Sequence, residues 1–83
     1  MKNVKFEILS ENLERGKYYA LAKITLDGIS DYCLIASDGE IAIESVGGEF
    51  GRAEEIYAIV ASANVASIHL SDVISDMQNE IFA

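Results

Sequence analysis

Two Asp-Gly pairs, followed by a change in the spacing of the apolar residues, constrain the fold of this chain more than any other feature. Asp27-Gly28 and Asp38-Gly39 each lie between runs rich in β-branched and aromatic residues. Asp-Gly favours a two-residue type I′ hairpin turn, because both of its positions take a positive φ. The sequence therefore predicts an antiparallel meander of about four strands, at Val4–Leu9, Tyr18–Leu26, Ile29–Ser37 and Glu40–Val46.

After Gly47-Gly48 the apolar residues recur with helical rather than strand spacing. One set predicts a first amphipathic helix and contains Ala53, Ile56, Tyr57, Val60 and Ala63. A later set predicts a second and contains Leu70, Val73, Ile74, Met77 and Ile81. Asn64 is expected to end the first helix and Ser67 to cap the second. Strands followed by helices, without βαβ alternation, predict one α+β domain over residues 1–83, with both helices packed on one sheet face.

Two-residue turns at both Asp-Gly pairs place Leu26 opposite Ile29 and Ser37 opposite Glu40. The face expected under the helices then carries Tyr19, Leu21, Tyr32, Leu34, Ile41 and Ile43. The opposite face carries Tyr18, Ala20, Ala22, Ile24, Cys33, Ile35, Ala42 and Val46, with the acids Asp31, Glu40 and Glu44.

That second face is too apolar for a solvated sheet face, which normally alternates to polar residues. Two interpretations stay open. The register slips, for instance through a bulge, and the true alternation is cleaner. Alternatively the face is an association surface, with Tyr18 and Ile35 in it and a homodimer as the simplest outcome.

Charge is distributed unevenly along the chain, which has a formal net charge of -8. Arg52 is the only cation after Lys23, against eleven acids in the same stretch. A negative surface of this kind argues against direct binding to nucleic acid or anionic membrane and favours a basic protein partner. No apolar run has the roughly 20 residues that a membrane span needs, the opening residues predict no secretory signal, and Cys33 has no partner for a disulfide. A cytoplasmic location is expected.

Asp72, Asp76 and Glu80 follow one another at intervals of four residues and form an acidic ridge along the second helix. The ridge is either a solvated helix face or a docking edge for Lys and Arg side chains. His69, Asp72 and Asp76 share a helix side and are the candidate metal ligands, although the second His or Cys of ordinary sites is missing. No cofactor is expected, because Gly47-Gly48-x-x-Gly51 lacks the Lys-Ser/Thr ending of a phosphate loop.

A further pattern runs through the C-terminal part of the chain. Its two pieces are Ala53-Glu54-Glu55-Ile56-Tyr57-Ala58-Ile59-Val60 and Ser67-Ile68-His69-Leu70-Ser71-Asp72-Val73-Ile74-Ser75-Asp76. It resembles the C-terminal half of a family of small uncharacterised Firmicute proteins, a domain of unknown function that ends in Ser-Pro-Ile-His-Leu-x-Asp-Val-Val-Glu-Asp. This chain lacks the Pro before Ile68 and has Ser75 where the family has Glu. The resemblance implies that His69 and Asp72 belong to a helix start, and it brings no activity with it.

Three functions fit these features. The first is a non-catalytic acidic interaction protein, homodimeric, that binds a basic surface of a partner as a regulator or inhibitor. The second is a phage-type inhibitor that mimics nucleic acid, such as an anti-CRISPR or anti-restriction protein. The third is a small-molecule binder or minor enzyme at a dimer seam, with Tyr18, Asp31, Glu40 and Glu44 in it.

Overall fold

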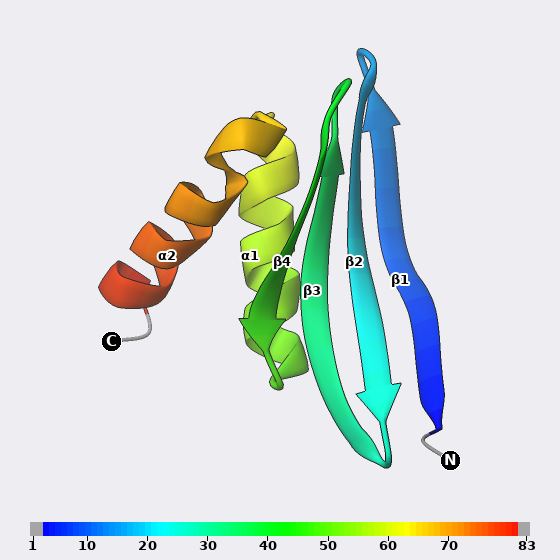
Figure 1. Cartoon of the computed structure of the whole chain (residues 1–83). Coiled ribbons are helices and arrows are strands. Elements are labelled where there is room, and N and C mark those ends of the chain that lie inside the picture. Colours follow the sequence, from blue (N-terminus) through cyan, green and yellow to red (C-terminus); the bar gives the residue numbers. More distant parts are fainter. Residues whose placement is uncertain (1–2, 82–83) are drawn as a thin grey trace.

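A computed structural model describes residues 3–81 of the chain, and the side chains of residues 3–78. Four strands precede two α-helices and a short 3-10 turn (Figure 1). In chain order they are β1 (Val4–Glu14), β2 (Lys17–Leu26), β3 (Ile29–Ser37), β4 (Ile41–Gly47), α1 (Phe50–Ser62), η1 (Ser67–His69) and α2 (Leu70–Ile81).

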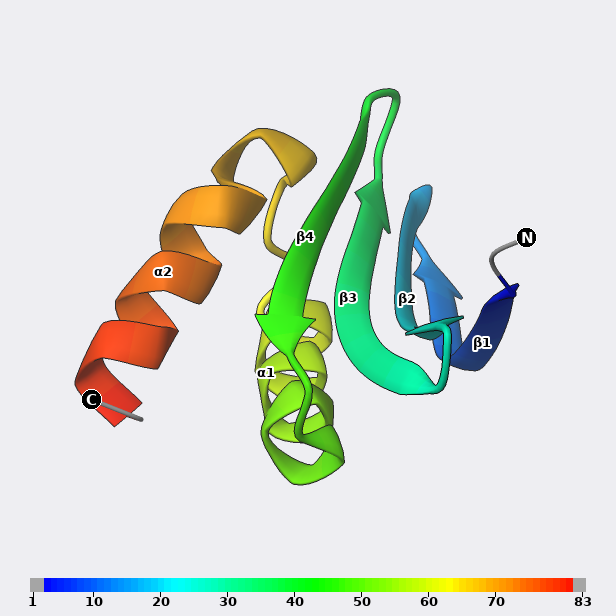
Figure 2. The same cartoon turned by 60° about the horizontal axis from the view of Figure 1, so that its bottom comes forward.

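The strands form one antiparallel sheet in the order β1-β2-β3-β4, so each strand pairs with its neighbour in sequence. Both helices pack on the same face of this sheet, which confirms the predicted α+β arrangement (Figures 1 and 2). We call the other face the open face. Of the helices in residues 3–81, none is long and apolar enough to span a lipid bilayer.

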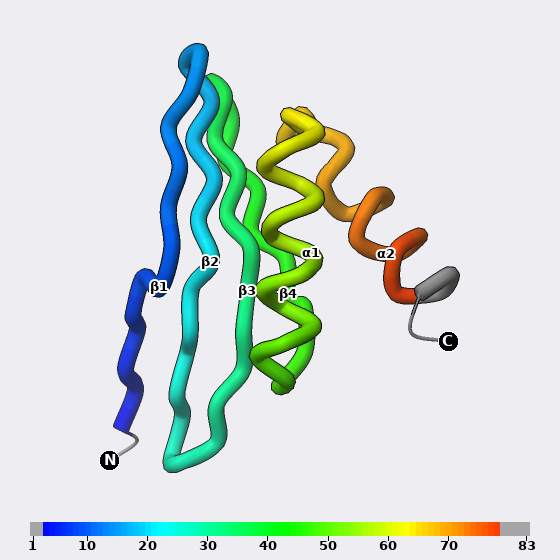
Figure 3. The backbone as a smooth tube through the Cα atoms, turned by 180° about the vertical axis from the view of Figure 1, so that it is seen from behind, coloured from blue at the N-terminus to red at the C-terminus, as the bar shows by residue number. Residues whose placement is uncertain are grey.

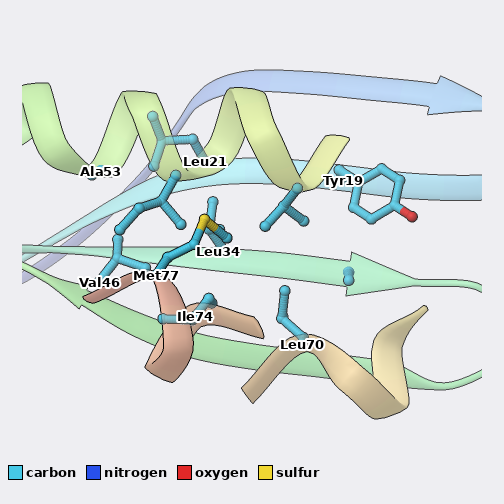
Figure 4. Packing of buried hydrophobic residues seen from close by; sticks show 11 residues of the cluster. Tyr19, Leu21, Leu34, Val46, Ala53, Leu70, Ile74 and Met77 are labelled. Carbon is cyan, nitrogen blue, oxygen red and sulfur yellow. The ribbon is translucent and has the colours of Figure 1, made fainter. Parts of the chain in front are cut away.

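The core lies between the sheet and the two helices (Figure 4). Helix α1 buries Ala53, Ile56 and Val60, which are three or four residues apart and so share one side of the helix. Helix α2 buries Leu70, Ile74 and Met77, which are also three or four residues apart. The sheet contributes Tyr19, Leu21, Leu34, Ala36 and Val46.

The first hairpin loop with Asp-Gly forms as predicted. Asp27 has φ 51° and Gly28 has φ 85°, and Leu26 pairs with Ile29. A second two-residue turn, Arg15-Gly16, joins β1 to β2, and both of its residues also have positive φ. Strand β1 therefore continues to Glu14, beyond the predicted end at Leu9.

The Asp38-Gly39 turn was predicted wrongly. Ser37 pairs with Ile41 rather than with Glu40, so the loop has three residues, 38–40. The backbone N–H of Asp38 donates to the carbonyl of Glu40 at 3.1 Å, and Gly39 alone of the three has a positive φ. Because side chains alternate between faces, this one-residue difference moves every side chain of β4 to the opposite side from the one expected.

The corrected register exchanges the two sets of β4 residues. Ile41 and Ile43, expected under the helices, lie on the open face, where they pair with Ser37 and Ile35. Ala42 and Val46, expected on the open face, lie on the helix side, and Val46 belongs to the core. Glu44 also lies on the helix side and Glu40 in the loop, so neither is part of the open face.

Helix α1 ends at a Schellman motif, as the sequence indicated from Asn64. Asn64 has φ 53°, its N–H donates to the carbonyl of Ala61, and the N–H of Val65 donates to the carbonyl of Val60. The prediction that Ser67 caps the second helix with its side chain was wrong. Its hydroxyl donates to Asp38 in the β3–β4 loop instead of capping the helix, so the cap comes from a distant part of the chain.

Candidate functional site

The open face is an apolar surface that no other part of the described chain covers. Eight of the large apolar side chains that are exposed to solvent belong to it: Val4, Phe6, Ile8, Leu13, Leu26, Ile29, Ile41 and Ile43. Several of them are exposed by more than half, with Ile29 at 75% and Phe6 at 57%. A monomeric protein rarely leaves so large a contiguous apolar patch in water.

Strand pairing arranges these side chains in five rows across the sheet. The rows are Val4-Leu26-Ile29, Phe6-Ile24-Asp31, Ile8-Ala22-Cys33-Ser45, Glu11-Ala20-Ile35-Ile43 and Leu13-Tyr18-Ser37-Ile41. The middle of the face is low, because Ala20, Ala22 and Cys33 are small and already buried. Large side chains surround this shallow centre on both edge strands.

Strand β1 presents its apolar side to the open face and its polar side to the helix layer. Val4, Phe6 and Ile8 alternate with the charged Lys5 and Glu7. The helices do not cover the polar side, because α1 packs on β2, β3 and β4 while β1 lies at the far edge (Figure 3). Val4, Phe6 and Ile8 lie on the face away from the helices, and all three are exposed.

Among the residues of the open face that the structure describes, two are acids, Glu11 and Asp31, and none is a cation. Tyr18 donates its hydroxyl hydrogen to Glu11 at 2.7 Å, and Ser45 donates to Asp31 at 3.2 Å. The hydrogen bond to Glu11 is the main cause of a raised Tyr18 pKa, so this hydroxyl stays protonated at neutral pH. Both acids thus already accept a hydrogen bond from a neighbouring strand.

A hollow of about 540 Å³ lies at the β2–β3 end of this face. It is lined by Ile24, Leu26, Ile29, Ser30, Asp31 and Gly48. A smaller hollow of about 270 Å³ lies at the β4–α1 connection, where Glu49 pairs with Arg52 at 3.3 Å. Gly47 and Gly48 lie in this connection, where β4 ends and α1 follows.

Cys33 is a free, buried cysteine in the centre of the open face. It is 4% exposed, and burial raises the pKa of its thiol above the ordinary value. The reactive thiolate is therefore scarce at neutral pH.

The structure separates the residues predicted to interact into three groups. Tyr18, Asp31 and Ile35 do lie together on the open face. Glu40 and Glu44 do not, because Glu40 lies in the β3–β4 loop and Glu44 lies on the helix side of the sheet. Asp72 and Asp76 of the acidic ridge are exposed on α2, on the other side of the molecule, while the side chain of Glu80 lies outside the described residues.

The proposed metal ligands are His69, Asp72 and Asp76. His69 is exposed in η1, one residue before α2 begins. Among the described residues, no group of three or more His, Cys, Asp or Glu side chains is placed to hold a metal ion.

Sequence reasoning missed two parts of the site. It did not place Val4, Phe6, Ile8 and Leu13 on the open face, although the alternation from Val4 to Ile8 is visible in the sequence. It also missed that Asp38 binds Ser67, for which no local pattern gives a signal.

Comparison with protein-family models, with curated proteins and with solved structures finds no match to this chain. The resemblance of the stretch from Ala53 to Asp76 to a Firmicute family therefore stays a prediction. The surface itself must carry any functional argument.

Proposed function

We infer that this protein is a non-catalytic interaction protein of the cytoplasm, which self-associates and binds a basic surface of a partner protein as a regulator or inhibitor. The observation that carries the self-association is the open face. An uncovered sheet face of this size, made mostly of large apolar side chains with two hydrogen-bonded acids among them, has the composition of a protein–protein interface.

The charge of the molecule supports a basic partner. Acidic residues number 14 against 6 Lys and Arg. Asp72 and Asp76 are exposed on α2, and Glu54 and Glu55 are exposed on α1, so the helix layer carries acids on its outer side. A surface of one sign attracts partners of the opposite sign and repels nucleic acid.

The acidic ridge can be tested separately from the open face. Purified wild type and an Asp72→Asn, Asp76→Asn variant are used as bait in nuclease-treated host lysate, and each captured protein is then purified and titrated by calorimetry at two salt concentrations. We expect a basic protein that binds the wild type at low salt and loses at least about tenfold in affinity to the variant, because exposed charge pairs are screened by salt.

A Glu54→Gln, Glu55→Gln variant is the matched control, because it also removes two exposed negative charges, but from α1 instead of α2. Equal loss with this control would mean that net charge alone governs binding. Binding of an uncharged partner, unaffected by salt or by either variant, would contradict the proposal.

A further inference from the structure

We propose that the open face is covered by the open face of a second copy of this chain, so that two sheets stack face to face in a symmetric dimer. The inference rests on the self-association in the proposed function and specifies its surface and its occupant. Three observations identify the occupant as a second copy: the size of the face, the pattern of β1 and the kind of charge that the face carries.

The face is large enough for a stable dimer. Its strands have 7 to 11 residues, which corresponds to about 30 Å of length, and four strands span about 19 Å. Each copy therefore offers about 600 Å², and two copies together bury about 1,200 Å². Specific interfaces begin at about this total area, whereas incidental contacts are mostly smaller.

Strand β1 gives most of its large apolar side chains to this face: Val4, Phe6, Ile8 and Leu13 lie on it, whereas Leu9 packs against the core. Val4, Phe6 and Ile8 contribute nothing to the packing between sheet and helices, because they point to the opposite side. Without a covering layer, β1 would gain stability from its pairing with β2 and from Leu9, which packs against the core, while Val4, Phe6 and Ile8 would add no hydrophobic contact. A second sheet provides the missing hydrophobic contact, and sheets pack in this way at about 10 Å separation.

The charges of the face favour a second copy over the basic partner. Cations are absent from the five rows, and the two acids, Glu11 and Asp31, are separated by the uncharged row of Ala22 and Cys33. Interfaces between identical subunits are the most apolar class, and a basic protein would find little to pair with here. Exposed acids are concentrated instead on the helix layer, at Asp72 and Asp76 among others.

The distribution of small and large side chains on the face is also suited to a symmetric contact. Small residues form its centre, namely Ala20, Ala22 and Cys33, and large ones such as Phe6 and Ile43 stand on the two edge strands. With a modest angle between the two sheets, large side chains of one copy settle over the shallow centre of the other. The resulting order of layers is helix, sheet, sheet, helix, and each outer layer displays one acidic ridge.

Sedimentation equilibrium over a wide concentration range tests the proposal directly. One chain has a mass of 9.0 kDa, so we expect a species of twice that mass at micromolar concentration. Phe6→Glu places a carboxylate on the face in both copies at once, and we expect it to raise the dissociation constant by about two orders of magnitude or more.

Lys5→Gln is the matched control for Phe6→Glu. It changes the net charge by the same amount at the neighbouring residue, but on the helix side of β1, and it should leave the dimer intact. Circular dichroism of each variant establishes that the sheet and helices are retained.

Ile43→Glu distinguishes face stacking from pairing of strand edges. Phe6 and Ile43 lie on β1 and β4, the two opposite edges of the sheet. Stacked faces predict that both substitutions dissociate the dimer, whereas edge pairing depends on one edge only. A wild type that stays monomeric at all concentrations, or a dimer that survives both substitutions, overturns the proposal. Because sedimentation needs no partner protein, failure here is independent of the result for the acidic ridge.

Discussion

Asp38 holds Ser67 with both of its carboxylate oxygens, and so ties the β3–β4 loop to the start of the second helical segment. The backbone N–H of Ser67 donates to Oδ2 at 3.0 Å, and its hydroxyl donates to Oδ1 at 2.7 Å. The two residues are 29 positions apart in the sequence. This carboxylate provides the cap that the residues just before η1 do not supply.

Removal of this carboxylate should destabilise the protein measurably. We expect Asp38→Ala to lower the midpoint of thermal unfolding by several degrees, because the N–H and hydroxyl of Ser67, which is buried, lose their acceptor. Glu40→Ala is the control, since it removes an exposed carboxylate from the same loop. Equal midpoints for the two variants would contradict a capping role for Asp38.

The same contact predicts how stability depends on pH. Hydrogen bonds from Ser67 are the main cause of an Asp38 pKa below its ordinary value of about 4. A carboxyl whose pKa is lowered on folding stabilises the fold above its unfolded pKa, and this contribution is lost as pH falls through the lowered value. Urea unfolding of wild type and Asp38→Ala should therefore differ at pH 6 and converge below about pH 4. A difference that stays constant from pH 6 down to about pH 2 would count against the assignment.

The sequence predicted the parts of the fold that depend on local chemistry. Asp27-Gly28 forms its two-residue turn with a positive φ at both residues, and the carboxylate of Asp27 also accepts a hydrogen bond from the N–H of Asn3. Asp38-Gly39 has the same two residues and yet forms a three-residue loop, in which Gly39 alone has a positive φ. The same dipeptide thus forms loops of two different lengths in one chain, so the register of β4 could not be predicted from the dipeptide.

The open face illustrates both the strength and the limit of hydrophobic alternation. The sequence already indicated that one face was too apolar for solvent, and a slipped register was the alternative explanation. A different register does occur, but it makes the face more apolar, because it brings Ile41 and Ile43 onto it. A bulge between Ile8 and Ser10 also restores Leu13 to that face, which strict alternation from Val4 would not have given.

Two adjacent tyrosines allow a comparison of a buried and an exposed hydrogen bond. Tyr19, which is 3% exposed, donates to the carbonyl of Val65 at 2.6 Å and so fixes the segment after α1. Tyr19→Phe should lower the free energy of unfolding by about 1 kcal/mol, because that carbonyl loses its donor. Tyr18→Phe removes the exposed bond to Glu11 and should cost less than about 0.5 kcal/mol. Chemical denaturation of both variants gives the comparison, and a larger cost at Tyr18 would refute it.

The left-handed residue at the end of α1 predicts that one substitution at this position is destabilising and another is nearly neutral. Asn64 has φ 53°, a conformation that Asn and Gly adopt more easily than other residues. Asn64→Ala should therefore cost about 1 kcal/mol of stability, while Asn64→Gly should stay within about 0.5 kcal/mol of the wild type. Ala63→Gly is the control, because Ala63 has φ -84° and gains nothing from glycine. A destabilising Asn64→Gly with a neutral Asn64→Ala would show that the left-handed conformation is not needed there.

Cys33 reports on the open face without any change to the sequence. Its thiol is buried, and burial raises its pKa, so reaction with a thiol reagent such as Ellman's reagent should be slow in the native protein and fast in urea. Because Cys33 lies in the central row of the face, a covering copy should slow the reaction further. The rate in Phe6→Glu should accordingly exceed that in the wild type, whereas Lys5→Gln should match the wild type. Equal rates for all three proteins at concentrations where the wild type is dimeric would mean that Cys33 lies away from the contact between the copies.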